Sequence, residues 1–312
     1  MAGRRPGRNS VAIALAVALL VVAPPLLPSY WVGLLTQMVI LAILAMSLDI
    51  LLGYTGLPSL GHAAFFGVAA YAVAVLSVRY GANFWVCVLG GILIGTLLSA
   101  VLGLIVSHVR DVYFLMITLA IGMVLWGLGH RWIPVTGGDN GISGIPPLEV
   151  HAGLPFQGPL ALHYATLVVF LICAGLMRLV VRSPFGLTLR GIRENEGRMK
   201  SLGFNTWLHC YLSFVVAGAF ASVSGVMWAY YNGFVSPTYL DLTASSELFL
   251  MVTLGGPSTL VGPMIGAGAI VLLKNVMSAY TARWLLILGI VYIVAILAAP
   301  QGLWNLRKRP SA

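Results

Sequence analysis

Residues 182–205 read RSPFGLTLRGIRENEGRMKSLGFN and form the only long charged stretch of this 312-residue chain. Seven of the chain's 17 basic and 8 acidic residues fall within these 24 positions. Long apolar runs flank the stretch on both sides. A charged segment between two membrane spans is often no more than a solvated loop, but the order of the residues here favours a folded element.

That order predicts one short amphipathic helix. Pro184 and Gly186 favour a turn, and residues 187–202 can then be helical. The expected apolar side consists of Leu189, Ile192 and Leu202, and the expected solvent side consists of Arg190, Arg193, Glu194 and Arg198. Gly203 and Asn205 suit the end of the helix, where a left-handed residue is needed. Such a helix would lie flat at the membrane surface and offer a docking element to a protein outside the membrane.

The composition excludes an ordinary soluble domain. Apolar residues make up 60% of the chain, charged residues make up 8%, and the mean hydropathy is +0.98; a soluble domain carries about 25% charged residues. The apolar runs repeatedly reach the ~20 residues with which an α-helix crosses a lipid bilayer. A β-barrel would instead have short alternating segments. The chain is therefore predicted to be an all-α, polytopic integral membrane protein.

About ten transmembrane helices are expected. They are placed at residues 11–27, 31–52, 61–78, 84–107, 111–129, 161–181, 208–231, 243–256, 259–278 and 283–300. The predicted organisation is an N-terminal tail over 1–10, a single transmembrane domain over 11–304 and a C-terminal tail over 305–312. Two long connections stand out, an outer loop over 131–160 and the charged loop over 182–207.

Basic residues set the predicted orientation. With both termini in the cytoplasm, thirteen Lys and Arg residues fall on the cytoplasmic side and four on the outer side, which follows the positive-inside rule. The charged loop then faces the cytoplasm. Because the net charge of +9 follows this topology, it does not indicate nucleic-acid binding.

Two uncharged connections predict broken or re-entrant segments. They read GYTGLPSLG at 53–61 and GGPSTLVG at 255–262, and a small-residue run follows each. Irregular backbone at membrane depth is tolerated only inside protein or beside a water-filled cavity, and broken helices mark the transport path of many carriers. A tight helical hairpin built for close packing is the alternative reading.

Motifs for chemistry on the chain itself are missing from the sequence. It contains no phosphate-binding loop, no HExxH and no GxSxG, and its three cysteines have no CxxC spacing, so neither an enzyme nor a metal site is expected. Asp49 and Glu247 are acids within predicted spans, with either a functional or a structural partner. Two classes remain, a transporter energised by a docked protein and a carrier driven by an ion gradient. The amphipathic helix favours the first.

Five segments carry a resemblance to a known family. They are GYTGLPSLGHAAFFGVAAYA at 53–72, TGGDNGISGIP at 136–146, the charged stretch at 182–205, SGVMWAYYNGFVSP at 224–237 and ELFLMVTLGGPSTLVGPMIGA at 247–267. In this order they resemble the LivM-type permeases of branched-chain amino acid ABC transporters. The resemblance implies a permease subunit in a bacterial inner membrane, with a second homologous permease, two cytoplasmic ATPases that hold ATP and Mg²⁺, and an external solute-binding protein as partners. The chain itself would hold no cofactor.

The resemblance also implies roles for particular residues. The ATPase-coupling element would include Arg190, Arg193, Glu194, Glu196 and Gly203. The family usually has alanines after the second Glu, whereas this chain has Gly197, Arg198 and Met199. Glycine weakens a helix by about 1 kcal/mol relative to alanine, so the strength of coupling is open.

Leucine, isoleucine or valine is the expected substrate. Related permeases serve urea, short amides or aromatic acids, and selectivity in such importers rests largely with the binding protein. The expected translocation path comprises Gly56, Ser59, Gly61, His62, Gly255 and Gly256. Bulky substitutions at Gly56 or Gly61 are then expected to block uptake and leave assembly intact.

Overall fold

The computed structural model describes residues 20–147 and 158–280, together with isolated positions between 283 and 304. The first half contains η1 (Pro24–Leu26), α2 (Ser29–Asp49), η2 (Ile50–Thr55), α3 (His62–Ala74), η3 (Val75–Arg79), α4 (Phe84–Val106), α5 (Asp111–Arg131), α6 (Ile133–Thr136), η4 (Gly138–Asn140) and β1 (Ile142–Ser143). The second half contains α7 (Pro159–Arg182), α8 (Pro184–Glu194), α9 (Glu196–Ser201), α10 (Thr206–Asn232), β2 (Phe234–Val235), η5 (Pro237–Leu240), α11 (Leu242–Gly255) and α12 (Val261–Tyr280).

The described elements confirm an all-α membrane protein. Seven helical segments are long and apolar enough to cross a bilayer: α2 with η2, α3 with η3, α4, α5, α7, α10 and α12. These correspond to seven of the ten predicted spans. The predicted eighth span is α11, which has 14 residues and is short for a crossing. About half of the predicted first span and two thirds of the tenth lie outside the described residues.

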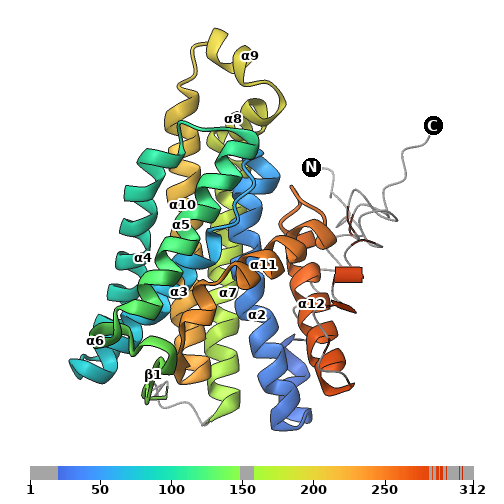
Figure 1. Cartoon of the computed structure of the whole chain (residues 1–312). Coiled ribbons are helices and arrows are strands. Elements are labelled where there is room, and N and C mark those ends of the chain that lie inside the picture. Colours follow the sequence, from blue (N-terminus) through green and yellow to red (C-terminus); the bar gives the residue numbers. More distant parts are fainter. Residues whose placement is uncertain are drawn as a thin grey trace.

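Three helices form the centre of the bundle (Figure 1). α10 packs against both α2 and α3, and the three helices are mostly buried, whereas α4 and α5 expose most of their apolar side chains at the periphery. Leu93, Leu97 and Val101 of α4 are each more than half exposed. In a membrane such a surface faces lipid, so exposed leucines here need no protein partner.

Small residues allow the close packing of α4 on α10. Gly91, Gly95, Ser99 and Gly103 recur every four residues along α4 and are all buried. A side chain added at Gly95 would meet Ser222 of α10. Since lipid tails are as apolar as leucine, helix association in membranes depends on such close contact.

The two ends of the bundle carry different structures. α8 and α9 project at one end, and β1 with α6 lies at the other (Figure 1). β1 pairs antiparallel with β2, with Ile142 opposite Val235 and Ser143 opposite Phe234. β1 lies within the predicted outer loop, which is folded up to Pro147, and β2 follows α10. Residues 148–157 of the loop lie outside the described part.

Candidate functional site

α8 is the first half of the predicted amphipathic helix. Pro184 occupies its first turn, and the hydroxyl oxygen of Ser183 accepts a hydrogen bond from the Gly186 backbone N–H at 3.4 Å. Leu189 and Ile192 are buried against the bundle as predicted, because they share one face of the helix.

A single helix over residues 187–202 was the wrong prediction. The chain is extended at Asn195, and the Asn195 side-chain oxygen accepts the Arg198 N–H at 2.9 Å, which starts α9 as a second short helix. Asparagine side chains compete for backbone hydrogen bonds in this way and interrupt helices. As a result Leu202 does not join the apolar side but is 66% exposed.

Glu196 anchors α9 to the bundle. Its carboxylate accepts hydrogen bonds from Arg110 Nε at 3.0 Å and from the Thr206 hydroxyl at 2.9 Å, and Lys200 Nζ lies 3.1 Å from it. Partial burial raises the pKa of the Glu196 carboxyl, but the hydrogen bonds from Arg110, Thr206 and Lys200 outweigh this effect and lower the pKa to about 2. The carboxylate is therefore charged throughout the physiological range.

Two arginines of α8 reach back over the end of α2. Arg193 Nη1 donates to the carbonyl oxygen of Gly53 and to the hydroxyl of Ser258. The Arg190 guanidinium lies 4.9 Å from the ring centroid of Tyr54, a cation–π contact. Although both side chains are largely exposed, their guanidinium groups contact η2. The guanidinium of Arg193 also contacts the segment between α11 and α12.

That segment, residues 256–260, is fixed from inside by Asp49. The fully buried Asp49 carboxylate accepts the backbone N–H groups of Ser258 at 2.7 Å and Leu260 at 3.1 Å. Ser258 and Leu260 both have positive φ, at 67° and 54°, a strained conformation for residues other than glycine. Asp49 thus has a structural role, in which it stabilises the strained loop that Arg193 contacts from outside.

The remaining predicted coupling residues lie on the exposed side of α8 and α9. Glu194 is exposed and forms no ion pair with any described residue. Gly203 has a φ of +85° and ends α9, where its N–H bonds to the Lys200 carbonyl at 3.0 Å, as its sequence position predicts. Leu187, Leu202 and Phe204 are apolar side chains exposed in the same stretch of chain, by 61%, 66% and 42%.

The predicted path residues of the first connection, residues 53–61 and His62, are packed closely against neighbouring segments. Gly56 has a φ of +79° and lies beneath Arg193, and a side chain at Gly61 would meet the backbone carbonyl of Thr118. His62 Nε2 lies 2.8 Å from the hydroxyl of Ser47. The buried His62 Nδ1 and the Ser59 hydroxyl have no hydrogen-bond partner among the described residues.

The second connection is packed in a similar way. A side chain at Gly255 would meet the carbonyl oxygen of Gly262, and Gly256 has a φ of +109°. These close contacts fit the alternative interpretation, in which small residues allow a tight helical hairpin. The role of the six residues in the translocation path stays a prediction.

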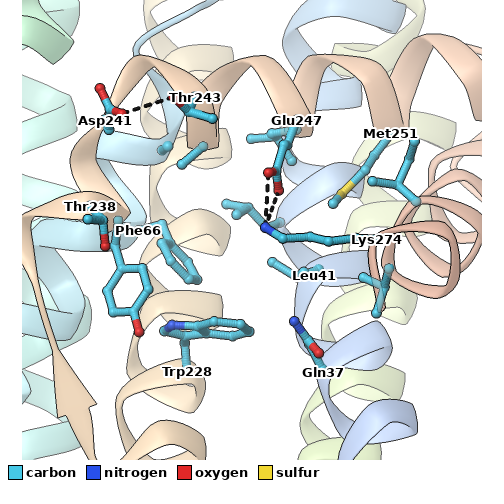
Figure 2. A pocket seen from close by; sticks show the side chains of 17 residues that line it. Gln37, Leu41, Phe66, Trp228, Thr238, Asp241, Thr243, Glu247, Met251 and Lys274 are labelled. Atoms are coloured by element: carbon cyan, nitrogen blue, oxygen red, sulfur yellow. Dashed lines mark hydrogen bonds and ion pairs between the residues drawn. The ribbon is translucent and has the colours of Figure 1, made fainter. Parts of the chain in front are cut away.

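A cavity of about 350 Å³ lies elsewhere, enclosed by α2, α3, α10, η5, α11 and α12 (Figure 2). Glu247 points into it from α11 and meets Lys274 of α12, with Nζ 2.9 Å and 3.0 Å from the two carboxylate oxygens. None of the predicted path residues lines this cavity. Glu247 is recognisable from the sequence as an acid in a predicted span, but its pairing with Lys274 was missed. The signal for the pair was the presence of two opposite charges in adjacent apolar spans.

Comparison with known proteins gives consistent matches. A family model described as the permease component of branched-chain amino acid transport systems matches residues 30–297. The high-affinity branched-chain amino acid transport system permease protein LivM of Salmonella typhimurium is 28% identical over 313 residues, which cover 92% of this chain and 73% of the relative. LivM of Escherichia coli K12 is 29% identical with the same coverage.

The chain is also similar to a second type of permease. The probable branched-chain amino acid transport permease protein LivH of Methanocaldococcus jannaschii is 26% identical over 293 residues, which cover 86% of this chain and 91% of the relative. No solved structure gives a significant match to the chain.

Proposed function

The chain belongs to the family of permease components of branched-chain amino acid transport systems, and from this membership we propose that it is the membrane-spanning subunit of an ATP-driven importer of leucine, isoleucine and valine. It is a multi-pass membrane protein with seven long apolar helices among its described residues. In the proposal it resides in the bacterial inner membrane, with α8, α9 and both termini in the cytoplasm.

The importer contains this chain and a second, homologous permease. Similarity of the chain to both LivM and LivH relatives supports such a pair. Two cytoplasmic ATPases complete the membrane complex and bind ATP and Mg²⁺, and an external binding protein delivers the solute. This chain acts as a transport subunit and performs no catalysis.

The ATPases dock on the exposed side of α8 and α9. Leu187, Leu202 and Phe204 supply apolar contact at this end of the bundle, and Glu194 and Arg198 supply exposed charges beside them. An exposed apolar patch rimmed by charge outside the membrane spans is the usual composition of a protein-binding surface.

Movement passes from this dock into the membrane through Arg193. The observation that carries the coupling role is that one guanidinium bonds both to Gly53, at the end of α2, and to Ser258, in the strained loop that follows α11. Because charge-assisted hydrogen bonds are strong and directional, displacement of α8 by the ATPases displaces this loop and α11 with it.

Co-purification tests the docking surface. A pull-down of the detergent-solubilised importer compares the wild-type chain with Leu202→Asp, which places a charge beside the docking surface, and with Asn83→Asp, which places the same charge at an exposed residue before α4. We expect two ATPase chains and a second permease with the wild type and with Asn83→Asp, and loss of the ATPases from Leu202→Asp. Purification of the wild-type chain without any ATPase would refute the proposal and favour a gradient-driven carrier.

A further inference from the structure

The ion pair between Glu247 and Lys274 has a high desolvation free energy for a contact that only joins two helices. Both residues belong to apolar helices, Glu247 to α11 and Lys274 to α12, and their side chains are 14% and 36% exposed. Removing two charges from water costs several kcal/mol per ion, and an apolar pair of similar size often connects two helices at least as well. Ionisable groups at membrane depth are therefore functional by default.

The surroundings of the pair have the form of a small-molecule site. The cavity volume of about 350 Å³ lies at the lower end of the range for ligand pockets, which suits a small solute. Phe66, Trp228 and Tyr239 form an aromatic wall, with ring centroids 5.8 Å apart for Phe66–Trp228 and 5.7 Å apart for Trp228–Tyr239. Leu41 and Met251 add aliphatic surface beside the ion pair, and the lining also includes the polar side chains of Gln37, Thr238, Asp241 and Thr243 (Figure 2).

From this arrangement we propose, resting on the importer function above, that the cavity binds the transported amino acid as a zwitterion. The substrate carboxylate replaces Glu247 at Lys274, and the substrate ammonium group replaces Lys274 at Glu247. Its branched side chain lies against the aromatic and aliphatic wall. The cavity is thus a binding site for the solute among α2, α3, α10, η5, α11 and α12.

Charge balance selects this class of substrate. Opening the pair around a zwitterion converts one ion pair into two and leaves the net charge of the lining, which also includes Asp241, unchanged. A monocarboxylate such as an aromatic acid would pair with Lys274 and leave the Glu247 carboxylate without its cation in apolar surroundings. Urea and short amides carry no charge with which to separate the pair. Because an unpaired buried charge costs far more than a paired one, amino acids are favoured over these other solutes.

Equilibrium binding to the assembled importer tests the site directly. The importer is placed in lipid nanodiscs without its binding protein, and saturable binding of radiolabelled leucine is measured with two competitors that each lack one charge. 4-Methylpentanoate lacks the ammonium group, and 3-methylbutylamine lacks the carboxylate. We expect both analogues to compete at least tenfold more weakly than unlabelled leucine. Equal competition by either analogue, or no saturable binding of leucine, would overturn the proposal.

Three variants separate ligand binding from helix packing. Glu247→Gln with Lys274→Met removes both charges, and we expect leucine affinity at least tenfold below wild type. Glu247→Lys with Lys274→Glu keeps the ion pair between α11 and α12 but reverses it, so we expect normal assembly and weakened leucine binding. Ile265→Leu changes an exposed side chain of α12 that does not line the cavity, and this control is expected to bind leucine as the wild type does.

The same preparations distinguish a failure of the cavity proposal from a failure of the proposed importer function. ATPase content and stimulation of ATP hydrolysis by the loaded binding protein report on the importer function, and leucine binding reports on the cavity. An assembled, stimulated reciprocal variant with wild-type leucine affinity would overturn the cavity proposal alone. A wild-type preparation without ATPases would overturn the importer function instead.

Discussion

Removing the Asp49 carboxylate should unfold the loop that joins α11 to α12. The carboxylate is fully buried and accepts two backbone N–H groups, from Ser258 and Leu260, at 2.7 Å and 3.1 Å. A buried N–H without a partner costs about 1–3 kcal/mol. Asp49→Ala should therefore lower the free energy of unfolding by about 2–6 kcal/mol, and Asp49→Asn, which keeps one acceptor oxygen, by about half as much. The strain at the two positive-φ residues adds to the tendency of this loop to change conformation.

The free energy of unfolding is measured by denaturant titration of the purified chain in mixed micelles. Asp111→Asn is the matched control, because Asp111 is exposed and asparagine tolerates its positive φ of 53°. We expect the control to unfold as the wild type does. If Asp49→Ala unfolds within about 0.5 kcal/mol of the control, which is the usual range of surface substitutions, the carboxylate does not hold the loop and the reasoning is refuted.

Three further predictions follow from contacts in the described residues. Arg193→Met should lower leucine uptake per ATP hydrolysed by about tenfold, equivalent to about 1.4 kcal/mol of lost coupling, whereas Arg131→Met, at an exposed position of α5 outside α8 and α9, should not. Equal ratios for the two variants would exclude Arg193 from coupling. Gly61→Ala should reduce the yield of assembled importer because its side chain would meet backbone, and Gly127→Ala, which has open space, should not; normal assembly with blocked uptake would instead favour a path position for Gly61. Since the pKa of Glu196 is lowered to about 2, the contribution of its carboxylate to stability is present above the ordinary pKa of 4.5 and is lost as the pH falls toward 2. The difference in unfolding free energy between the wild type and Glu196→Gln should therefore stay constant from pH 8 to about pH 5.5. A difference that changes over this range would contradict the assignment.

The length of the apolar runs and the local order of residues were enough to predict most of the fold. Apolar runs of about 20 residues are long enough only for spanning helices, and this constraint located all seven long apolar helices. The end of α9 at Gly203 was also predictable, because a left-handed position favours glycine. The break at Asn195 was missed because a side chain that bonds backbone three residues ahead leaves the helical pattern of the flanking residues unchanged.

The site could be predicted only in part, because its contacts join distant segments. Arg193 was expected to face solvent, and its helical position does so, but its guanidinium reaches Ser258, 65 residues further along the chain. Asp49 was recognisable as an acid in an apolar span, while its partners belong to a loop more than 200 residues away. Periodicity reports the face on which a side chain begins and does not report which distant segment folds against it.

ATP-dependent uptake into proteoliposomes tests directly whether this chain is a subunit of an ATP-driven importer. The chain is reconstituted with its second permease and ATPases, ATP is enclosed on the ATPase side, and radiolabelled leucine is added with the binding protein on the other side. The account predicts uptake that requires hydrolysable ATP and the binding protein and that persists when ionophores collapse all ion gradients. Uptake by this chain that proceeds without ATP and stops on addition of ionophores would contradict it.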